Sequence, residues 1–133
     1  MSYSELEVKT AHTTQFINIT ASLKEIVQES GVLNGICLVY IPHTTAGVTI
    51  NEAADPAVAR DILMMLGKVV PGRDDYSHME GNSAAHIKAS LVGSSVHVPV
   101  VSGKLMIGTW QGIFFCEFDG PRRRSVSVQL IGK

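Results

Sequence analysis

Cysteine is scarce in this sequence, and its two cysteines, Cys37 and Cys116, lie far apart within apolar stretches. This spacing predicts neither a disulfide framework nor a cysteine-based zinc site, so both thiols are expected to be buried and free. Positive charge is not in excess either, because 11 Lys and Arg stand against 12 Asp and Glu, for a net charge of −1. This balance argues against a protein that binds nucleic acid electrostatically.

Long apolar runs are also missing, and none approaches the ~20 residues that span a bilayer. The first residues lack the basic segment and apolar core of a secretion signal. We therefore expect no membrane partner and a cytoplasmic location. Hydrophobic residues nevertheless make up 45% of the chain, which favours a packed core over disorder. A chain of 133 residues is expected to form one domain, residues 1–133.

Local signals predict three helices. Ser22 and Glu25 have the spacing of a capping box at the start of the first helix. Asp55 can cap the second, with Pro56 as its first residue, and Asn82 is the expected cap of a shorter third helix. The predicted helices cover residues 22–31, 56–69 and 83–91.

About seven strands are predicted from alternating or continuously apolar segments. They cover residues 6–10, 14–19, 36–41, 95–101, 104–107, 112–118 and 124–131. A further strand over 44–51 would place His43 and Asn51 on one face and Val48 on the other. Because strands close the chain in a run, rather than alternating with helices, the fold class expected is α+β.

Three histidines stand in polar clusters within this apolar chain: His43, His78 and His86. Imidazole is the commonest protein ligand of zinc, and three protein ligands plus water form an open, catalytic site. The spacing matches no single tight motif, and a lone histidine after a strand is more often a hydrogen-bonded structural residue. Glu80 can be a fourth ligand, a base acting on metal-bound water, or a carboxylate stabilised by a helix N-terminus.

Other polar residues suit a small anionic or aromatic ligand. Asn82 and the N–H groups of the following helix suit an anion, to which Lys88 can add charge unless it is an ordinary exposed lysine. Trp110 can stack on a ring whose edge Gln111 binds, although a core tryptophan beside a turn is an equal alternative. Glu117 lies among apolar residues, where burial raises a carboxyl pKa unless a cation such as an arginine of the last strand pairs with it.

In order along the chain, these clusters resemble the YjbQ family, also called UPF0047 or the secondary thiamine-phosphate synthase family. The resemblance covers nearly the whole chain. The matching motifs are His43-Thr-Thr-Ala-Gly-Val-Thr-Ile-Asn51-Glu52 with Asp55-Pro56, Tyr76-Ser-His78-Met-Glu80-Gly81, His86-Ile-Lys88 with Leu91 and Gly93, and Gly108-Thr-Trp-Gln-Gly112 with Glu117. Some relatives carry an aspartate where Met79 stands here, so no aspartate role is transferred to that position.

The resemblance implies a compact α+β fold with a β-sandwich, a homotrimer, and a metal ion near the three histidines. It also implies a weak thiamine-phosphate synthase activity, which joins a pyrimidine diphosphate to a thiazole phosphate with loss of pyrophosphate. Zinc suits histidine ligands, whereas pyrophosphate departure more often uses Mg²⁺ on oxygen ligands, so Mg²⁺ or Mn²⁺ are alternatives to zinc.

On this basis we expect a metal-dependent enzyme that acts on a small phosphorylated metabolite. The alternatives are a trimeric module that binds a metal or an anion, and a metal-assisted hydrolase. The metal ligands expected are His43, His78 and His86, and the catalytic residues expected are Glu80, Lys88 and Glu117. The substrate-binding residues expected are Thr44, Asn51, Asn82, Trp110 and Gln111.

Overall fold

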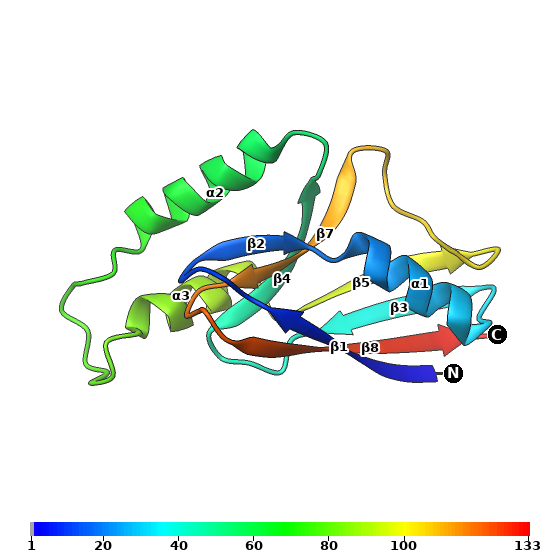
Figure 1. Cartoon of the computed structure of the whole chain (residues 1–133), viewed down its shortest axis with the longest axis horizontal. Coiled ribbons are helices and arrows are strands. Elements are labelled where there is room, and N and C mark those ends of the chain that lie inside the picture. Colours follow the sequence, from blue (N-terminus) through cyan, green and yellow to red (C-terminus); the bar gives the residue numbers. More distant parts are fainter. Residues whose placement is uncertain (1) are drawn as a thin grey trace.

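Residues 2–133, which the computed structural model describes, form two antiparallel sheets and three helices (Figure 1). The strands are β1 Ser2–Lys9, β2 Gln15–Asn18, β3 Gly35–Tyr40, β4 Ala46–Glu52, β5 Ser95–Val101, β6 Lys104–Leu105, β7 Gln111–Glu117 and β8 Arg123–Gly132. The helices are α1 Thr20–Ser30, α2 Pro56–Val69 and α3 Ser83–Val92. Sheet A has the order β1-β8-β3-β5-β6 and sheet B the order β2-β7-β4. The predicted α+β class is confirmed.

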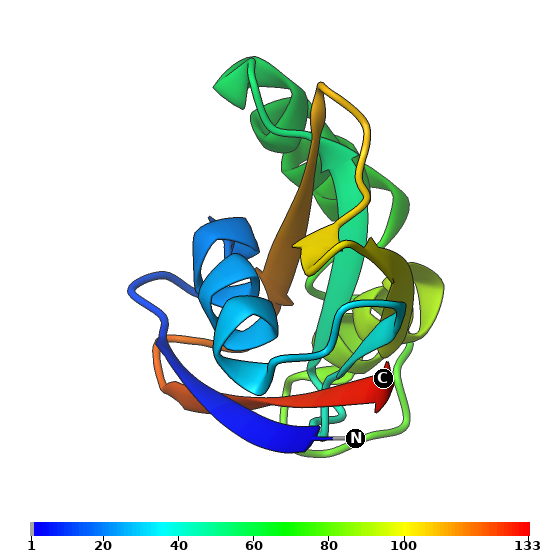
Figure 2. The same ribbon diagram turned by 90° about the vertical axis from the view of Figure 1, so that its right-hand side faces the viewer.

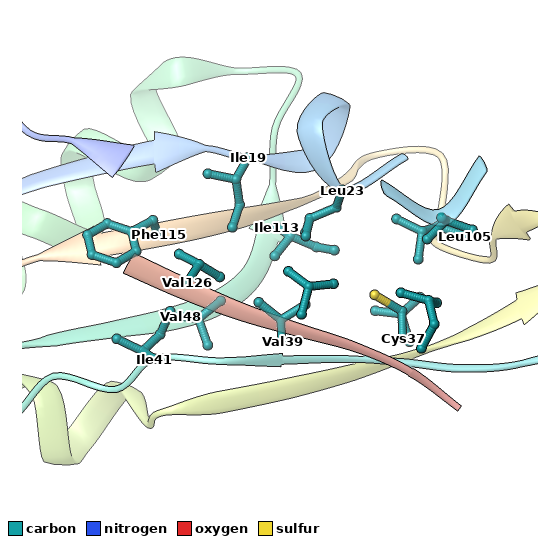
Figure 3. Close-up of a cluster of buried hydrophobic side chains, with 14 of the residues drawn as sticks. Ile19, Leu23, Cys37, Val39, Ile41, Val48, Leu105, Ile113, Phe115 and Val126 are labelled. Carbon is teal, nitrogen blue, oxygen red and sulfur yellow. The ribbon is translucent and has the colours of Figure 1, made fainter. Parts of the chain in front are cut away.

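The core lies between the inner faces of the two sheets. Strand β7 shows how, because successive side chains of a strand point to opposite faces. Ile113 and Phe115 point inward and are fully buried against sheet A, while Phe114 and Cys116 point outward into a second cluster. Figure 3 shows the inner side chains meeting Val126 of β8. The uninterrupted apolar run of β7 therefore reflects burial on both faces.

The three helices cover the sheets unequally (Figure 2). Helix α1 buries Leu23 and Val27 in the core between the sheets. Helix α3 places Ala85 and Ala89 on the outer face of sheet B, where Leu63 and Leu66 of α2 also pack. No helix of residues 2–133 covers the outer face of sheet A, which is the lower side of the molecule in both views.

Asp55 caps its helix as predicted, whereas the capping box predicted at Ser22 does not form. The Asp55 carboxylate accepts a hydrogen bond from Ala57 N at 2.9 Å, as a cap should, and Gly31 ends α1 with a left-handed φ of 73°. The capping box at Ser22 does not form, because α1 begins two residues earlier. There Asn18 Oδ1 accepts from both Thr20 N and Thr20 Oγ1, at 3.0 and 2.6 Å.

Helix α2 departs from expectation in its packing. Although apolar residues repeat at helical spacing along it, none of its residues is buried, and Met65 and Val69 are 51% and 64% exposed. The helix lies against sheet B at one side only, so a helical pattern alone does not ensure that its apolar side chains are buried.

No helix of residues 2–133 has both the length and the apolar character needed to cross a membrane.

The observed strand boundaries differ from the predicted ones where backbone pairing extends beyond the apolar residues. The first strand begins at Ser2 rather than Leu6, because it pairs with β8 along its whole length, from Ser2 opposite Leu130 onward. The segment after His43 does form a strand, β4, which makes eight strands within residues 2–133. Cys37 and Cys116 are free and buried, as predicted.

Candidate functional site

His43 lies in the loop between β3 and β4, at one end of the sandwich. Its Nε2 accepts a hydrogen bond from the backbone N–H of Ser125 at 3.0 Å. A nitrogen that accepts must carry its lone pair, so the ring is neutral with its proton on Nδ1. Burial and then the nearby charge of Arg124 hold the pKa of His43 below its usual value. This neutral histidine can therefore donate a hydrogen bond from Nδ1 at physiological pH.

His86 links two hollows at this end of the molecule. One hollow of about 380 Å³, here the His43 hollow, is lined by His43, Thr44, His86 and Ser90. The other, of about 400 Å³, is the His78 hollow and is lined by Tyr76, His78, Ser83 and His86. Because α3 places His86 at the border between them, one imidazole can serve both spaces.

His78 lies in the loop before α3, and its ring makes a T-shaped contact with the ring of His86. The ring centroids are 5.2 Å apart and the planes are nearly perpendicular, at 85°. Glu80 follows closely, with Oε2 at 3.8 Å from His78 Nε2, and its side chain is 75% exposed. A contact this long and this exposed adds little stability, so both side chains are available to a ligand.

Glu117 is held in a buried ion pair that joins the two sheets. Strand alternation puts Glu117 on the inner face with Phe115, and Arg124 on the inner face of β8. Arg124 Nε donates to Glu117 Oε1 at 2.9 Å, Arg124 Nη2 contacts Oε2, and Thr10 Oγ1 donates to Oε1 at 2.7 Å.

Burial alone would raise the pKa of Glu117, but hydrogen bonds from Arg124, Thr10 and the N–H of Asp119 outweigh it and lower the pKa. The arginine of the last strand, the alternative weighed for this carboxylate, is thus its partner, and the geometry is that of a structural bridge.

Asn82 ties the start of α3 to the loop after β7. It occupies the predicted cap position, but its side chain makes no capping bond, and Nδ2 instead donates to Asp119 Oδ2 at 3.0 Å. Asp119 also accepts from Arg122 Nη2 at 3.0 Å. Among the residues described, Asn82 Oδ1 is the one buried side-chain polar atom that has no hydrogen-bond partner. An unpaired acceptor of this kind is costly unless a ligand supplies a donor or cation.

The remaining predicted residues lie away from the histidines within one chain. Gln111 pairs with Glu52 at one end of the β4–β7 ladder, whereas Glu117 pairs with Ala46 at the histidine end, six residues away. Six residues of strand span roughly 20 Å. Asn51 and Trp110, which is 66% exposed, lie at this distant end with Gln111.

Lys88 also lies apart from the two hollows. It follows His86 by two residues, which is about 200° around a helix, and it lines neither hollow. Burial lowers the pKa of its ammonium group.

One residue of the site was not anticipated from the sequence. Ser90 lines the His43 hollow one helical turn after His86, and their i, i+4 spacing could have indicated it. For Glu117, the sequence offered an arginine of the last strand as a partner without saying which one. The structure identifies it as Arg124, which also donates to Thr45 Oγ1 and alternates with the buried Val126 and Val128 of the same strand.

Comparison with known proteins identifies the family. The model of the UPF0047 protein YjbQ-like family matches residues 4–133, nearly the whole chain. The chain belongs to this family. It is 50% identical over 128 residues to the UPF0047 protein YugU of Bacillus subtilis, covering 96% of this chain and 97% of the relative. It is also 50% identical over 126 residues to a UPF0047 protein of Methanocaldococcus jannaschii, covering 95% and 91%.

Solved structures of YjbQ-like proteins have the same fold. A crystal structure from Clostridium acetobutylicum, described as a conserved protein of the YjbQ/UPF0047 family, has a TM-score of 0.94 and 58% identity, over 96% of this chain and 99% of that one. A hypothetical protein from Aeropyrum pernix has a TM-score of 0.96 and 36% identity, and both chains are covered fully.

The resemblance to this family implies a metal ion. The described residues of one chain do not form a complete set of ligands for it. Within residues 2–133, no group of three or more His, Cys, Asp or Glu side chains is arranged to hold a metal ion. His78 and His86 line one hollow, and Glu80 contacts His78, but His43 lies in the other hollow with its Nε2 already bonded to Ser125. A three-histidine zinc site, with nitrogens ~2.0–2.1 Å from the ion, therefore does not fit this arrangement of a single chain.

Proposed function

We propose that the histidine end of this protein is the active site of an enzyme acting on a small phosphorylated metabolite. The observation that carries this proposal is His86, which borders both hollows and so brings His43 and His78 to one continuous region. Following the resemblance, the proposed reaction is thiamine-phosphate synthesis, in which a pyrimidine diphosphate is joined to a thiazole phosphate and pyrophosphate leaves. The proposed location is cytoplasmic.

The chain's own residues supply groups that suit a phosphorylated substrate. The first backbone N–H groups of α3 have no helical acceptor and favour an anion next to the His78 hollow. His43, held neutral by burial and Arg124, can donate a hydrogen bond from Nδ1 to a substrate oxygen. Thr44 and Ser90 line the same hollow and can bind substrate oxygens.

A divalent ion belongs to the proposal, with Zn²⁺ as the first choice and Mg²⁺ or Mn²⁺ as alternatives. When bound, such an ion would offset phosphate charge. Because one chain does not assemble three ligands, we derive no catalytic step through the metal.

Alanine variants of the three histidines test this proposal. His43→Ala, His78→Ala and His86→Ala are each expected to lower turnover of the pyrimidine diphosphate and thiazole phosphate by about 100-fold, because each removes a positioned imidazole. Turnover is measured as pyrophosphate release with added Zn²⁺, Mn²⁺ or Mg²⁺, and bound metal by elemental analysis.

His97→Ala is the matched control, because this histidine is exposed on β5 and lines neither hollow. Its oligomeric mass is measured as well, because His97 lies opposite Leu38 on the outer face of sheet A. Wild-type turnover in all three site variants, with stable folding, would contradict an active site at this end.

A homotrimer is also proposed, and the open outer face of sheet A supports it. This face exposes apolar side chains that no helix of residues 2–133 covers, including Tyr3, Ile36 and Tyr40 at 55%, 44% and 47% exposure. An uncovered apolar face of this kind marks an interaction surface. Light scattering of the purified chain should give three times its 14.3 kDa mass, and a monomer mass at micromolar concentration would rule the trimer out.

A binding module for a small anion or a metal is the second candidate function. The positions of the charged residues favour it. Glu117 is locked in an ion pair, and Lys88 lines neither hollow, so neither is free to transfer a proton to a ligand there. Saturable binding of both phosphorylated compounds without pyrophosphate release would favour this candidate, or a hydrolase acting on another substrate.

A further inference from the structure

A second cavity lies at the opposite end of the sandwich from the histidines. It is formed between α1, the segment that follows it, and the β5–β6 hairpin, and has a volume of about 550 Å³. We call it the α1 cavity. Strand β3 separates it from the His43 hollow, because Leu33 lies before this strand and His43 after it. The six residues of β3 span roughly 17 Å.

The cavity has an apolar floor and a positively charged rim. The floor is made by Val27, Val32 and Leu105, which are 1%, 4% and 7% exposed. The rim carries Lys24 of α1 and Lys104 of β6, which come from segments 80 residues apart in the sequence. None of the residues that line the cavity is Asp, Glu or His, so the two ammonium groups have no acidic partner within it.

The hairpin wall of the cavity has a rigid local structure. Ser102 and Gly103 have left-handed φ values of 52° and 77° and connect the paired Val101 and Lys104. A two-residue turn with two positive φ angles matches the twist of a hairpin. Gly103 N also donates to Leu33 O at 2.9 Å, which ties the turn to the segment after α1. The backbone therefore holds Lys104 near α1 before any ligand binds.

We propose that the α1 cavity binds a small amphiphilic acid, a molecule with an apolar body and one carboxylate or phosphate monoester group. The apolar body would lie on the floor, and the anionic group between Lys24 and Lys104, with the Gln28 amide as a further donor. A volume of about 550 Å³ is in the range of small-molecule sites, which combine apolar walls with a few convergent polar groups. This site is separate from the proposed active site and does not depend on it.

Methyl NMR spectra of the full chain, titrated with octanoate and octyl phosphate, test the proposal. Saturable shifts are expected at Val27, Val32 and Leu105, and the two probes show which anionic group is preferred. Octylammonium, with the same chain but the opposite charge, should bind at least about fivefold more weakly. Equal affinity for octylammonium, or shifts centred on other residues, would overturn the proposal.

Substitutions on the rim separate the charge from the apolar floor. Lys24→Gln and Lys104→Gln should each weaken octanoate binding about fivefold, because each removes one ammonium group. Lys68→Gln, on the exposed face of α2, is the matched control and should not change octanoate affinity.

Gln28→Trp, at an exposed position of α1, should fill the cavity and abolish the shifts caused by both probes. Unchanged affinity in both rim variants contradicts the assignment. His86→Ala should leave octanoate binding intact, so this test is independent of catalysis.

Discussion

Arg124→Met is expected to lower the free energy of unfolding by about 3–5 kcal/mol. The substitution leaves the Glu117 carboxylate, which is fully buried, without its cation. It also removes the hydrogen bond from Arg124 Nη2 to Thr45 Oγ1, 2.9 Å long, which holds the start of β4. Urea denaturation followed by circular dichroism measures the loss.

The neighbouring arginine provides a matched control. Arg123 makes an exposed ion pair with Glu7, with Nε at 3.7 Å from Oε1 and side chains 73% and 62% exposed. Arg123→Met should therefore cost less than about 1 kcal/mol. In the double variant Arg124→Met with Glu117→Leu, much of the loss should be recovered, because no buried charge remains unpaired. Equal stability of the two single arginine variants would show that the buried pair is not a major stabilising contact.

The same pair predicts how stability depends on pH. Because the pKa of Glu117 is lower in the folded protein than in the unfolded chain, its contribution is complete above the unfolded pKa of ~4.3. The contribution is lost as the pH falls through the lowered folded value. Glu117→Gln should be less stable at pH 7 and show a shallower loss of stability in acid.

In Arg124→Met, the pKa of His43 should rise, because the nearby positive charge of Arg124, which lowers this pKa, is gone.

Phe115→Ala is expected to lower the free energy of unfolding by about 3–5 kcal/mol. Phe115 is fully buried and is the largest such side chain between the sheets, opposite Val48 on β4 and Ile17 on β2. The truncation loses the transfer free energy of the ring and leaves a cavity that three strands cannot close. The midpoint and slope of a urea titration give the change.

Two further variants calibrate that loss. Phe115→Leu should be intermediate between the wild type and Phe115→Ala, because leucine fills part of the space. Met64→Ala, on helix α2 where Met64 is 47% exposed, should change stability by about 0.5 kcal/mol or less. If Phe115→Ala cost no more than Met64→Ala, the packing described between the sheets would be incorrect.

Many helices and strands could be predicted from local sequence patterns, and the incorrect predictions have physical causes. Asp55 and Gly31 mark helix ends through bonds to their own neighbours, so the sequence alone predicts them. The start of α1 was missed because Asn18, at the end of β2, binds Thr20 before the apparent capping box at Ser22. The pattern of α2 did not show that its apolar side chains would stay exposed, because helical spacing does not indicate what packs against the helix.

The candidate site was likewise predicted only in part. The motifs located His43, His78 and His86, and the structure brings them to two hollows joined by His86. They did not show that Trp110 and Gln111 lie at the other end of the β4–β7 ladder, or that Glu117 is paired with Arg124. These facts depend on strand register and on contacts between residues distant in sequence.

By itself, the sequence determined most of the types of element, the two buried thiols and the segments that carry the histidines. These features follow from periodicity and from bonds between near neighbours, which act over a few residues. Only the tertiary structure decided which ends of the strands meet, which carboxylate is neutralised, and that Lys24 and Lys104 border one cavity. Such juxtapositions arise from the pairing and packing of the two sheets, which no local pattern encodes.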